Sequence, residues 1–263
     1  MGFGRQTQPR PRSTGVLRSL IAPPGGVLIV SIDRRGLLMS FRVPMVLALA
    51  VLVAANVLAN RLPAASVVVG VGLTGVLVLI ARLGGLGPPD LGLARSSWSA
   101  GARWGGAFAA VVAAGYGVAL LIPAARAAVA GSGSGSWTQA LVQALVVIPL
   151  GTVIPEEFAF RGVLWGLLHR RWGRWTATLV SSVLFGFWHV APALAGGAAN
   201  QAVDEAVGGG PLGVLLRVAG TVLFTASAGV VFCGLRVRSG SLLAPMLAHW
   251  SVNGLGVIFV YLA

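Results

Sequence analysis

Apolar runs of about twenty residues recur along this chain, and they constrain its fold more than any other feature. A helix needs about 20 apolar residues to cross the hydrocarbon core of a bilayer. In lipid, a helix satisfies all its backbone hydrogen bonds within one segment. The sequence therefore predicts an all-α polytopic transmembrane helix bundle of about seven spans: 43–60, 63–81, 104–123, 138–168, 175–193, 212–235 and 242–262.

The composition agrees with a membrane protein and argues against a nucleic-acid partner. The chain is 56% hydrophobic and only 10% charged, whereas a soluble domain carries about 25% charged residues. All 19 basic residues are Arg and give a net charge of +13, but they are scattered between the apolar runs. A nucleic-acid-binding surface would gather them on one face. Membrane lipid is therefore the expected surrounding, and the Arg-only composition, rich in Ala, Gly and Val, suggests a GC-rich genome.

The arginines also predict an orientation. They concentrate in alternate connections, namely the N-terminal tail and the loops 82–103, 169–174 and 236–241. The intervening connections hold one Arg or none. Because positive charge stays on the cytoplasmic side, we expect the N-terminus in the cytoplasm of a protein integral to the plasma membrane. Residues 1–40 are interpreted as a basic, partly disordered cytoplasmic tail before a transmembrane domain at 41–263.

Two small motifs carry little chemical meaning. Gly70, Gly72 and Gly75 formally match a nucleotide-binding GxGxxG pattern, but they lie inside an apolar run and follow no strand. We interpret them as small residues for close helix packing. The single Cys233 lies in an apolar stretch, so it predicts neither a disulfide nor a thiolate metal site.

Polar groups inside a span are costly and mark functional sites, and six such residues are the candidates here. They are Glu156, Glu157 and Arg161 in the fourth span, His189 in the fifth, and His249 and Asn253 in the seventh. Glu157 and Arg161 are four residues apart, so they can pair on one helix face. Glu156 points about 100° away and stays free to act. Pro155 is expected to kink this helix and to admit water.

The rise of a helix, about 1.5 Å per residue, allows these groups to meet near the middle of the membrane. Two imidazoles and a carboxylate around water suit two chemistries. His189, His249 and Glu156 could bind zinc, which acidifies a bound water. Alternatively, Glu156 acts directly as a general base while His and Asn polarise a carbonyl. Both lead to peptide hydrolysis.

Interpretations from other classes remain open at this point. A membrane transporter or proton-coupled carrier could use the same Glu and His residues as a relay. A non-catalytic scaffold could use them to hold helices together. Other intramembrane proteases fit less well, because no His is followed by Glu as HExxH requires. The three aspartates, Asp33, Asp90 and Asp204, all fall in predicted loops rather than in spans.

Three motifs, taken in order, resemble a known family. Glu156–Arg161 reads EExxxR, Phe185–His189 reads FxxxH and His249–Asn253 reads HxxxN. Their order and spacing resemble the CPBP family of intramembrane endopeptidases, which is related to the CAAX prenyl protease Rce1 and to the Abi proteins. The resemblance covers about residues 138–255.

The resemblance implies a role for each matched residue. Glu156 would activate water, His189 would assist it, and His249 with Asn253 would stabilise the oxyanion or help to hold a metal. Glu157 and Arg161 would support them. The substrate would be a membrane-associated or lipidated protein or peptide, prenylated or bacteriocin-like. The family leaves open whether zinc is required, and the sequence leaves open the oligomeric state.

Overall fold

The computed structural model describes residues 34–129, 135–195, 208 and 210–263, and this part of the chain contains helices and no strand. The predicted all-α fold class is therefore confirmed. The first half consists of α1 (Arg34–Arg61), η1 (Pro63–Ala65), α2 (Ser66–Leu83), α3 (Pro88–Leu91), η2 (Arg95–Ser97), α4 (Trp98–Leu120) and α5 (Pro123–Ala127). The second half consists of α6 (Trp137–Val142), η3 (Gln143–Val147), η4 (Pro149–Val153), α7 (Ile154–Glu157), η5 (Phe158–Leu164), α8 (Trp165–Trp188), α9 (Val190–Leu194), α11 (Pro211–Ser239) and α12 (Leu243–Leu262).

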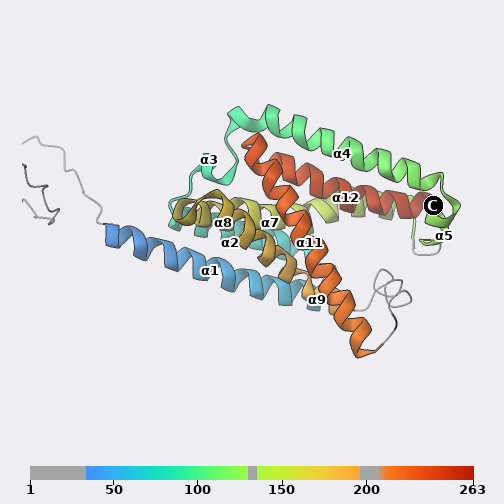
Figure 1. Cartoon of the computed structure of the whole chain (residues 1–263), viewed down its shortest axis with the longest axis horizontal. Helices are drawn as coiled ribbons and strands as arrows, with labels where there is room; N and C mark the ends of the chain where they lie inside the picture. The colour runs from blue at the N-terminus through green and yellow to red at the C-terminus, as the bar shows by residue number, and fades with distance from the viewer. Residues whose placement is uncertain (1–33, 130–134, 196–207, 209) are drawn as a thin grey trace, which may run out of the picture.

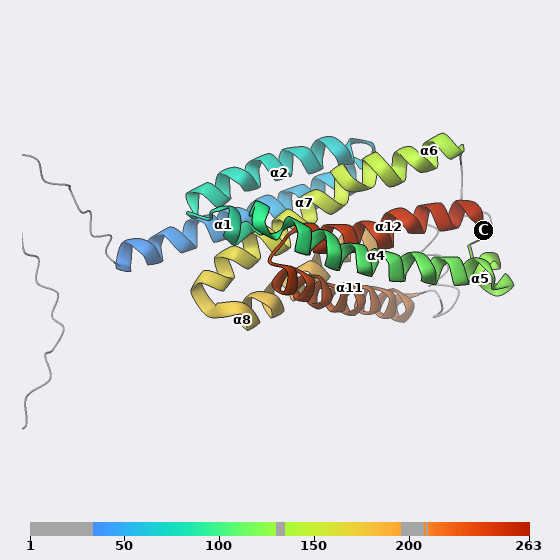
Figure 2. The ribbon, with the colours of Figure 1, turned by 90° about the horizontal axis from the view of Figure 1, so that it is seen from above.

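Six helical stretches of the described chain are long and apolar enough to cross a membrane, one fewer than predicted. The difference lies in residues 137–194, where the fourth and fifth predicted spans count as one stretch because helix continues directly on both sides of a kink at Gly173. The expected loop at 169–174 is absent, because only Gly173 leaves the helical conformation, with φ 80° and ψ 176°. Glycine adopts positive φ without steric cost, so a single residue is enough to turn the chain (Figure 2).

The ends of the predicted elements differ in two further places. Helix α1 begins at Arg34, so the backbone of residues 34–40 is helical rather than part of a disordered tail. The remaining tail, 1–33, lies outside the described residues, as do most of the expected GSGSGS loop and the acidic loop with Asp204 and Glu205. The predicted loop 82–103 contains the short helix α3 and the first turns of α4.

The helices lie side by side with the connections at two ends of a bundle. Figure 1 shows α3 at one end and the C-terminus at the other, with α4 and α12 running alongside each other. Helices α4 and α12 approach closely at two glycines. A side chain on Gly101 would meet Ser241 Oγ at 2.6 Å, and one on Gly105 would meet Leu247 Cβ at 2.8 Å. Small residues of this kind let helix backbones pack closely in lipid, and here they fix the position of α12.

Polar contacts gather at the α3 end of the bundle. Asp90 binds Arg170 with both carboxylate oxygens, at 3.1 and 2.6 Å. Arg236 of α11 donates to the carbonyl oxygens of Pro89 and Asp90 at 3.2 and 3.0 Å. The short helix α3 therefore ties α8 to α11 at the end of the bundle where the predicted Arg-rich loops lie.

The chain from η3 to η5 is helical but wider than an α-helix. Three segments, 143–147, 149–153 and 158–164, have π-helical turns, and Pro149 and Pro155 lie among them. Proline lacks an N–H and crowds the carbonyl four residues earlier, and wider turns accommodate both effects. Around Pro155, where the sequence predicts a kink, the structure shows a local widening of the helix. Segments of this kind are frequent at functional sites.

Neighbouring helices satisfy carbonyl groups of the widened segments. Ser181 of α8 donates to Phe160 O at 2.6 Å, and the Trp250 indole of α12 donates to Ala144 O at 2.8 Å. Inside a bilayer such groups have no water to bind, so partners from other helices replace it. These bonds also attach α8 and α12 to the glutamate-bearing stretch.

Of the three glycines in the GxGxxG pattern, only Gly70 makes the expected close packing. A Cβ at Gly70 would lie 2.5 Å from Leu150 O and 3.0 Å from Gly151 Cα of η4, whereas no atom of a neighbouring described segment lies within 4 Å of a Cβ at Gly72 or Gly75. Figure 2 shows α2 beside the stretch that leads into α7. Gly70 therefore sets the distance between α2 and the segment that carries the glutamates.

We predict that Gly70→Ala destabilises the protein and that Gly72→Ala does not. The methyl group at position 70 would press on a backbone carbonyl, and such overpacking costs about 1–3 kcal/mol. At position 72 there is room, and alanine is the better helix former. The measurement is the thermal unfolding midpoint in detergent. Equal midpoints for the two variants would contradict the packing role of Gly70.

Candidate active site

The two neighbouring glutamates of α7 lie inside the bundle and make different contacts. Glu157 is fully buried, and its Oε1 accepts a hydrogen bond from Arg161 Nη1 at 2.9 Å, with both side chains 0% exposed. The predicted Glu157–Arg161 pair is therefore confirmed. Two charges buried together cost far less than either would alone.

The Arg161 guanidinium is held further by aromatic rings. Its Cζ lies 4.0 Å from the ring centroid of Phe185 and 5.1 Å from that of Phe232. A cation over an aromatic face is attracted by the ring quadrupole, and more strongly where water is excluded. The rings of α8 and α11 thus replace part of the hydration that Arg161 loses on burial.

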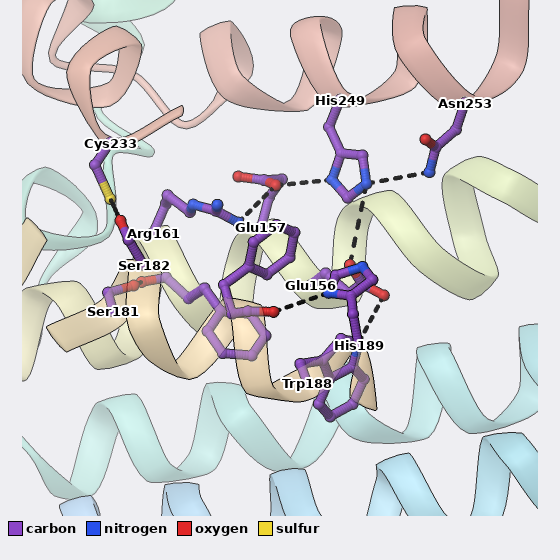
Figure 3. A network of polar contacts seen from close by, with 12 residues as sticks. Glu156, Glu157, Arg161, Ser181, Ser182, Trp188, His189, Cys233, His249 and Asn253 are labelled. Carbon is purple, nitrogen blue, oxygen red and sulfur yellow. Dashed lines mark hydrogen bonds and ion pairs between the residues drawn. The ribbon is translucent and has the colours of Figure 1, made fainter. Parts of the chain in front are cut away.

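Glu157 also orients His249, which comes from α12. The Nδ1 atom of His249 lies 2.8 Å from Glu157 Oε1, and Asn253 Nδ2 lies 3.2 Å from His249 Nε2 (Figure 3). An amide N–H can only donate, so Nε2 accepts. In a neutral imidazole the other nitrogen then carries the proton, and Nδ1–H donates to Glu157. One carboxylate oxygen therefore holds both Arg161 and His249.

Glu156 faces a different set of groups. Its Oε1 accepts from the Trp188 indole at 2.9 Å, and its Oε2 lies 4.0 Å from His249 Nε2. The side chain is 8% exposed, and Oε2 has no hydrogen-bond partner in the described part of the chain. A buried carboxylate oxygen without a hydrogen bond is costly. Glu157 Oε2 also has no hydrogen-bond partner in the described chain, but its side chain is 0% exposed, so Glu156 Oε2 is the better placed to bind an incoming hydrogen-bond donor.

His189 lies at the edge of this cluster. It ends α8 rather than lying inside a helix, and its Nδ1 lies 2.8 Å from Phe185 O. A carbonyl oxygen accepts only, so Nδ1–H donates and Nε2 is left as the free nitrogen. The Phe185 ring contacts both imidazoles, with ring centroids 4.7 Å from His189 and 5.9 Å from His249. His189 thus joins the cluster through a shared aromatic ring.

The structure brings the predicted site residues together to different degrees. Glu156, Glu157, Arg161, His249 and Asn253 form one connected group of polar contacts from η5, α7 and α12. The predicted meeting of distant spans inside the bundle is therefore confirmed. Within the described chain, His189 is linked to this group through the Phe185 ring rather than by a direct polar contact.

Sequence reasoning missed two residues that support Glu156. Trp188 donates its indole N–H to Glu156, and Asn56 of α1 donates to the backbone carbonyl of Trp188 at 2.9 Å. An indole N–H inside a span needs an acceptor. Because Trp188 is next to His189 in the sequence, this rule could have predicted that Trp188 donates to a site residue. Asn56 lies inside the first predicted span, but the sequence did not indicate its partner, which lies 132 residues away.

The donor groups meet part of what a zinc site requires. Zinc-binding imidazoles donate their second ring N–H to a carboxylate or a carbonyl, as both Nδ1 atoms do here. Tetrahedral zinc, however, would hold its nitrogen and oxygen ligands about 3.4 Å apart, while His249 Nε2 and Glu156 Oε2 are 4.0 Å apart. Among the described residues, no three His, Cys, Asp or Glu side chains form a metal-binding group. We therefore derive no step through a metal.

The fold and the site together define an integral membrane protein whose spans enclose a buried cluster of carboxylates, imidazoles and an amide. Residues 137–255 match the family described as type II CAAX prenyl endopeptidase Rce1-like, and this part of the chain belongs to that family. The family prediction is confirmed, and with it the general class of CAAX-type intramembrane protease. No curated protein and no solved structure gives a significant match.

We predict that Arg161→Met destabilises the protein more than the double change Glu157→Gln with Arg161→Met. The single change leaves a buried carboxylate without its cation, which costs about 3–5 kcal/mol. In the double variant no charge is stranded, and the carboxamide oxygen introduced at position 157 can still accept from His249. Thermal unfolding midpoints of the two variants test this. A double variant less stable than the single one would show that the ion pair does not account for the loss.

We predict that Trp188→Phe lowers peptide cleavage by roughly tenfold or more without lowering stability to match. The change keeps a ring against Phe160, 5.7 Å away, but removes the donor to a charged group, a bond that contributes about 1.5–3 kcal/mol. Trp175→Phe, at a 71% exposed position of the same helix, is the matched control. Initial rates and unfolding midpoints measured on both variants distinguish orientation of Glu156 from general packing.

Proposed function

We propose that this protein is an intramembrane endopeptidase in which Glu156 activates the attacking water. The observation that carries the proposal is the environment of that carboxylate. Trp188 fixes one oxygen, and the other, buried and without a hydrogen-bond partner among the described residues, lies 4.0 Å from His249 Nε2. A gap of this size is too long for a direct hydrogen bond and short enough for one water to bridge two acceptors.

In the proposed reaction the water donates one proton to Glu156 Oε2 while its oxygen attacks the carbonyl carbon of a peptide bond. His249 Nε2 accepts the second water hydrogen and sets the direction of attack. The Asn253 amide, 3.2 Å from Nε2, is then free to donate to the developing oxyanion. The C–N bond breaks as Glu156 passes its proton to the leaving amine. The second water hydrogen stays on the attacking oxygen, so the products are a carboxylic acid and an amine, and the acid then passes its proton to the amine.

The remaining groups support this chemistry. Glu157 holds the His249 tautomer that leaves Nε2 as an acceptor, and Arg161 is the buried ion-pair partner of Glu157. His189 has its free Nε2 at the edge of the cluster, where we propose that it assists the oxyanion or the leaving group. Because Glu156 acts directly in this scheme, metal analysis of the purified protein distinguishes it from a zinc-based reaction.

We further propose that the substrate is a membrane-associated or lipidated protein or peptide, prenylated or bacteriocin-like, that reaches the site from the lipid phase. The positions of the arginines support an N-terminus in the cytoplasm of a plasma-membrane protein. The matched family supports cleavage of the CAAX type in general terms.

We predict that Glu156→Gln reduces cleavage by about 100- to 10,000-fold, the usual contribution of a general base, while the protein stays folded. The change preserves the shape of the side chain and an oxygen for Trp188. New peptide termini in membrane fractions, compared between wild type and this variant, would identify substrates and supply the assay. The thermal unfolding midpoint should stay close to that of the wild type.

The chain offers a matched histidine series for the same assay. His189→Ala and His249→Ala should each abolish cleavage, whereas His169→Ala should not, because His169 only stacks on Trp165 beyond the site. Retained cleavage in Glu156→Gln would overturn the proposal. Proton or solute uptake by proteoliposomes, dependent on Glu156 and without cleavage, would favour a carrier instead.

A further inference from the structure

A cavity of about 870 Å³ adjoins the candidate active site and has no role in the steps described above. It lies between α6 and η3 on one side and α12 on the other. Its lining residues are Gly135, Gln139, Ala140, Gln143, Ile148, Asn253, Gly256, Val257, Val260 and Tyr261. The volume falls in the range of ligand pockets, about 300–1,000 Å³.

Asn253 is the residue through which this cavity adjoins the candidate active site. It lines the cavity and also binds His249 Nε2 at 3.2 Å, and that nitrogen lies 4.0 Å from Glu156 Oε2. An occupant that extends along the cavity to Asn253 would therefore lie beside the group that faces the proposed water. The outer end lies near the C-terminus, at the end of the bundle opposite α3 (Figure 1).

The lining is polar but carries no charge. Gln139, Gln143 and Asn253 supply three carboxamide side chains, and every other lining residue is apolar, Gly or Tyr. Carboxamides both donate and accept hydrogen bonds, as peptide groups do. A lipid acyl chain would leave them without partners, at a cost in free energy. A charged segment would find no counter-ion among the lining residues. The chemistry thus favours an uncharged peptide.

The spacing of the glutamines suits an extended chain. Gln139 and Gln143 are four residues apart, which is about 6 Å along a helix axis. Alternate residues of an extended strand repeat at about 6.6–6.8 Å. The spacing of the two glutamine side chains along the helix is therefore close to the spacing of backbone groups along one side of an extended peptide.

Aromatic residues connect the two walls at the outer end. Tyr261 donates to Gly135 O at 2.8 Å, and its ring centroid lies 4.4 Å from that of Trp137. Trp and Tyr are enriched where a membrane protein meets the interface with water. These contacts fix the distance between α6 and α12 at the cavity mouth.

We propose that this cavity, called here the amide groove, binds an extended, uncharged peptide segment of the substrate and leads its scissile bond to Glu156. The inference deepens the proposed function and rests on it for the fate of the bound peptide. Gln139 also caps α6 through its Oε1, 2.7 Å from Ser136 N, so Gln143 is the better position to test.

The binding test uses the full-length Glu156→Gln protein in liposomes, so it does not depend on cleavage. The probe is a capped six-residue Ala/Leu peptide with a benzophenone group. A matched peptide with two Lys residues and a benzophenone-bearing fatty-acid ester serve as comparisons. After illumination, mass spectrometry maps the labelled residues. We expect the neutral peptide to label residues of the amide groove and to be displaced by neither comparison probe.

Substitution at Gln143 provides the second measurement. Gln143→Leu keeps the side-chain size but removes the amide, so we expect about five- to tenfold weaker labelling, as loss of one hydrogen bond predicts. Leu145→Val, in the same segment but outside the lining, should leave labelling unchanged. With a cleavable substrate, Gln143→Leu should raise KM and leave kcat nearly constant.

The outcomes separate the two proposals. Glu156-dependent cleavage with labelling outside the amide groove, or with the fatty-acid probe bound in the groove, would contradict peptide binding in the groove. It would leave the proposed protease activity standing. Labelling of the groove by the neutral peptide, without cleavage by the wild type, would support peptide binding in the groove and contradict the proposed protease activity. An unchanged KM in Gln143→Leu would also overturn the groove.

Discussion

The organisation of the site depends on one buried carboxylate oxygen, Glu157 Oε1. It accepts from Arg161 and from His249, which come from different parts of the chain. A lone charge at this depth would be expelled or neutralised, so the pair with Arg161 is a condition for everything else. Once the pair is in place, the same oxygen sets the orientation of His249 and, through it, the geometry around Glu156.

The widened helical segments make this arrangement possible. Two prolines lie among π-helical turns between residues 143 and 164, and side chains of α8 and α12 donate to carbonyls of this stretch. The same bonds that satisfy the backbone therefore dock the two helices that carry His189 and His249. In this region of the fold, the hydrogen bonds that satisfy the backbone carbonyls also bring the site residues together.

Elements outside the family match also reach the site. Asn56 of α1 binds the Trp188 carbonyl, and the Trp188 indole binds Glu156. Gly70 of α2 sets the approach to η4, which precedes the glutamates. Residues 137–255 carry all the motifs, yet the position of the Glu156 carboxylate depends in part on the first two helices. These helices form a wall of the site as well as anchoring the chain in lipid.

Much of this could be predicted from the sequence where a local rule applies. Apolar runs indicated the helices, and the spacing of four residues indicated the Glu157–Arg161 pair. The turn between the fourth and fifth predicted spans was misjudged, because a single glycine at positive φ replaced a six-residue loop. The π-helical turns were not predictable, since the residue pattern of 143–164 has no feature that separates them from α-helix. Contacts such as Asn56 with Trp188 depend on packing between distant helices.

The two glutamates show why identical neighbours serve different purposes. On consecutive positions of α7 they point to different helices, so Glu157 meets a cation and Glu156 meets an indole. Glu157 is held in an ion pair with Arg161, so its role is structural. Within the described chain each glutamate keeps one oxygen free of hydrogen bonds, but the other oxygen of Glu156 is fixed by a neutral donor and its free oxygen lies 4.0 Å from His249 Nε2. Difference in environment, rather than in residue type, thus separates the structural carboxylate from the one proposed to react.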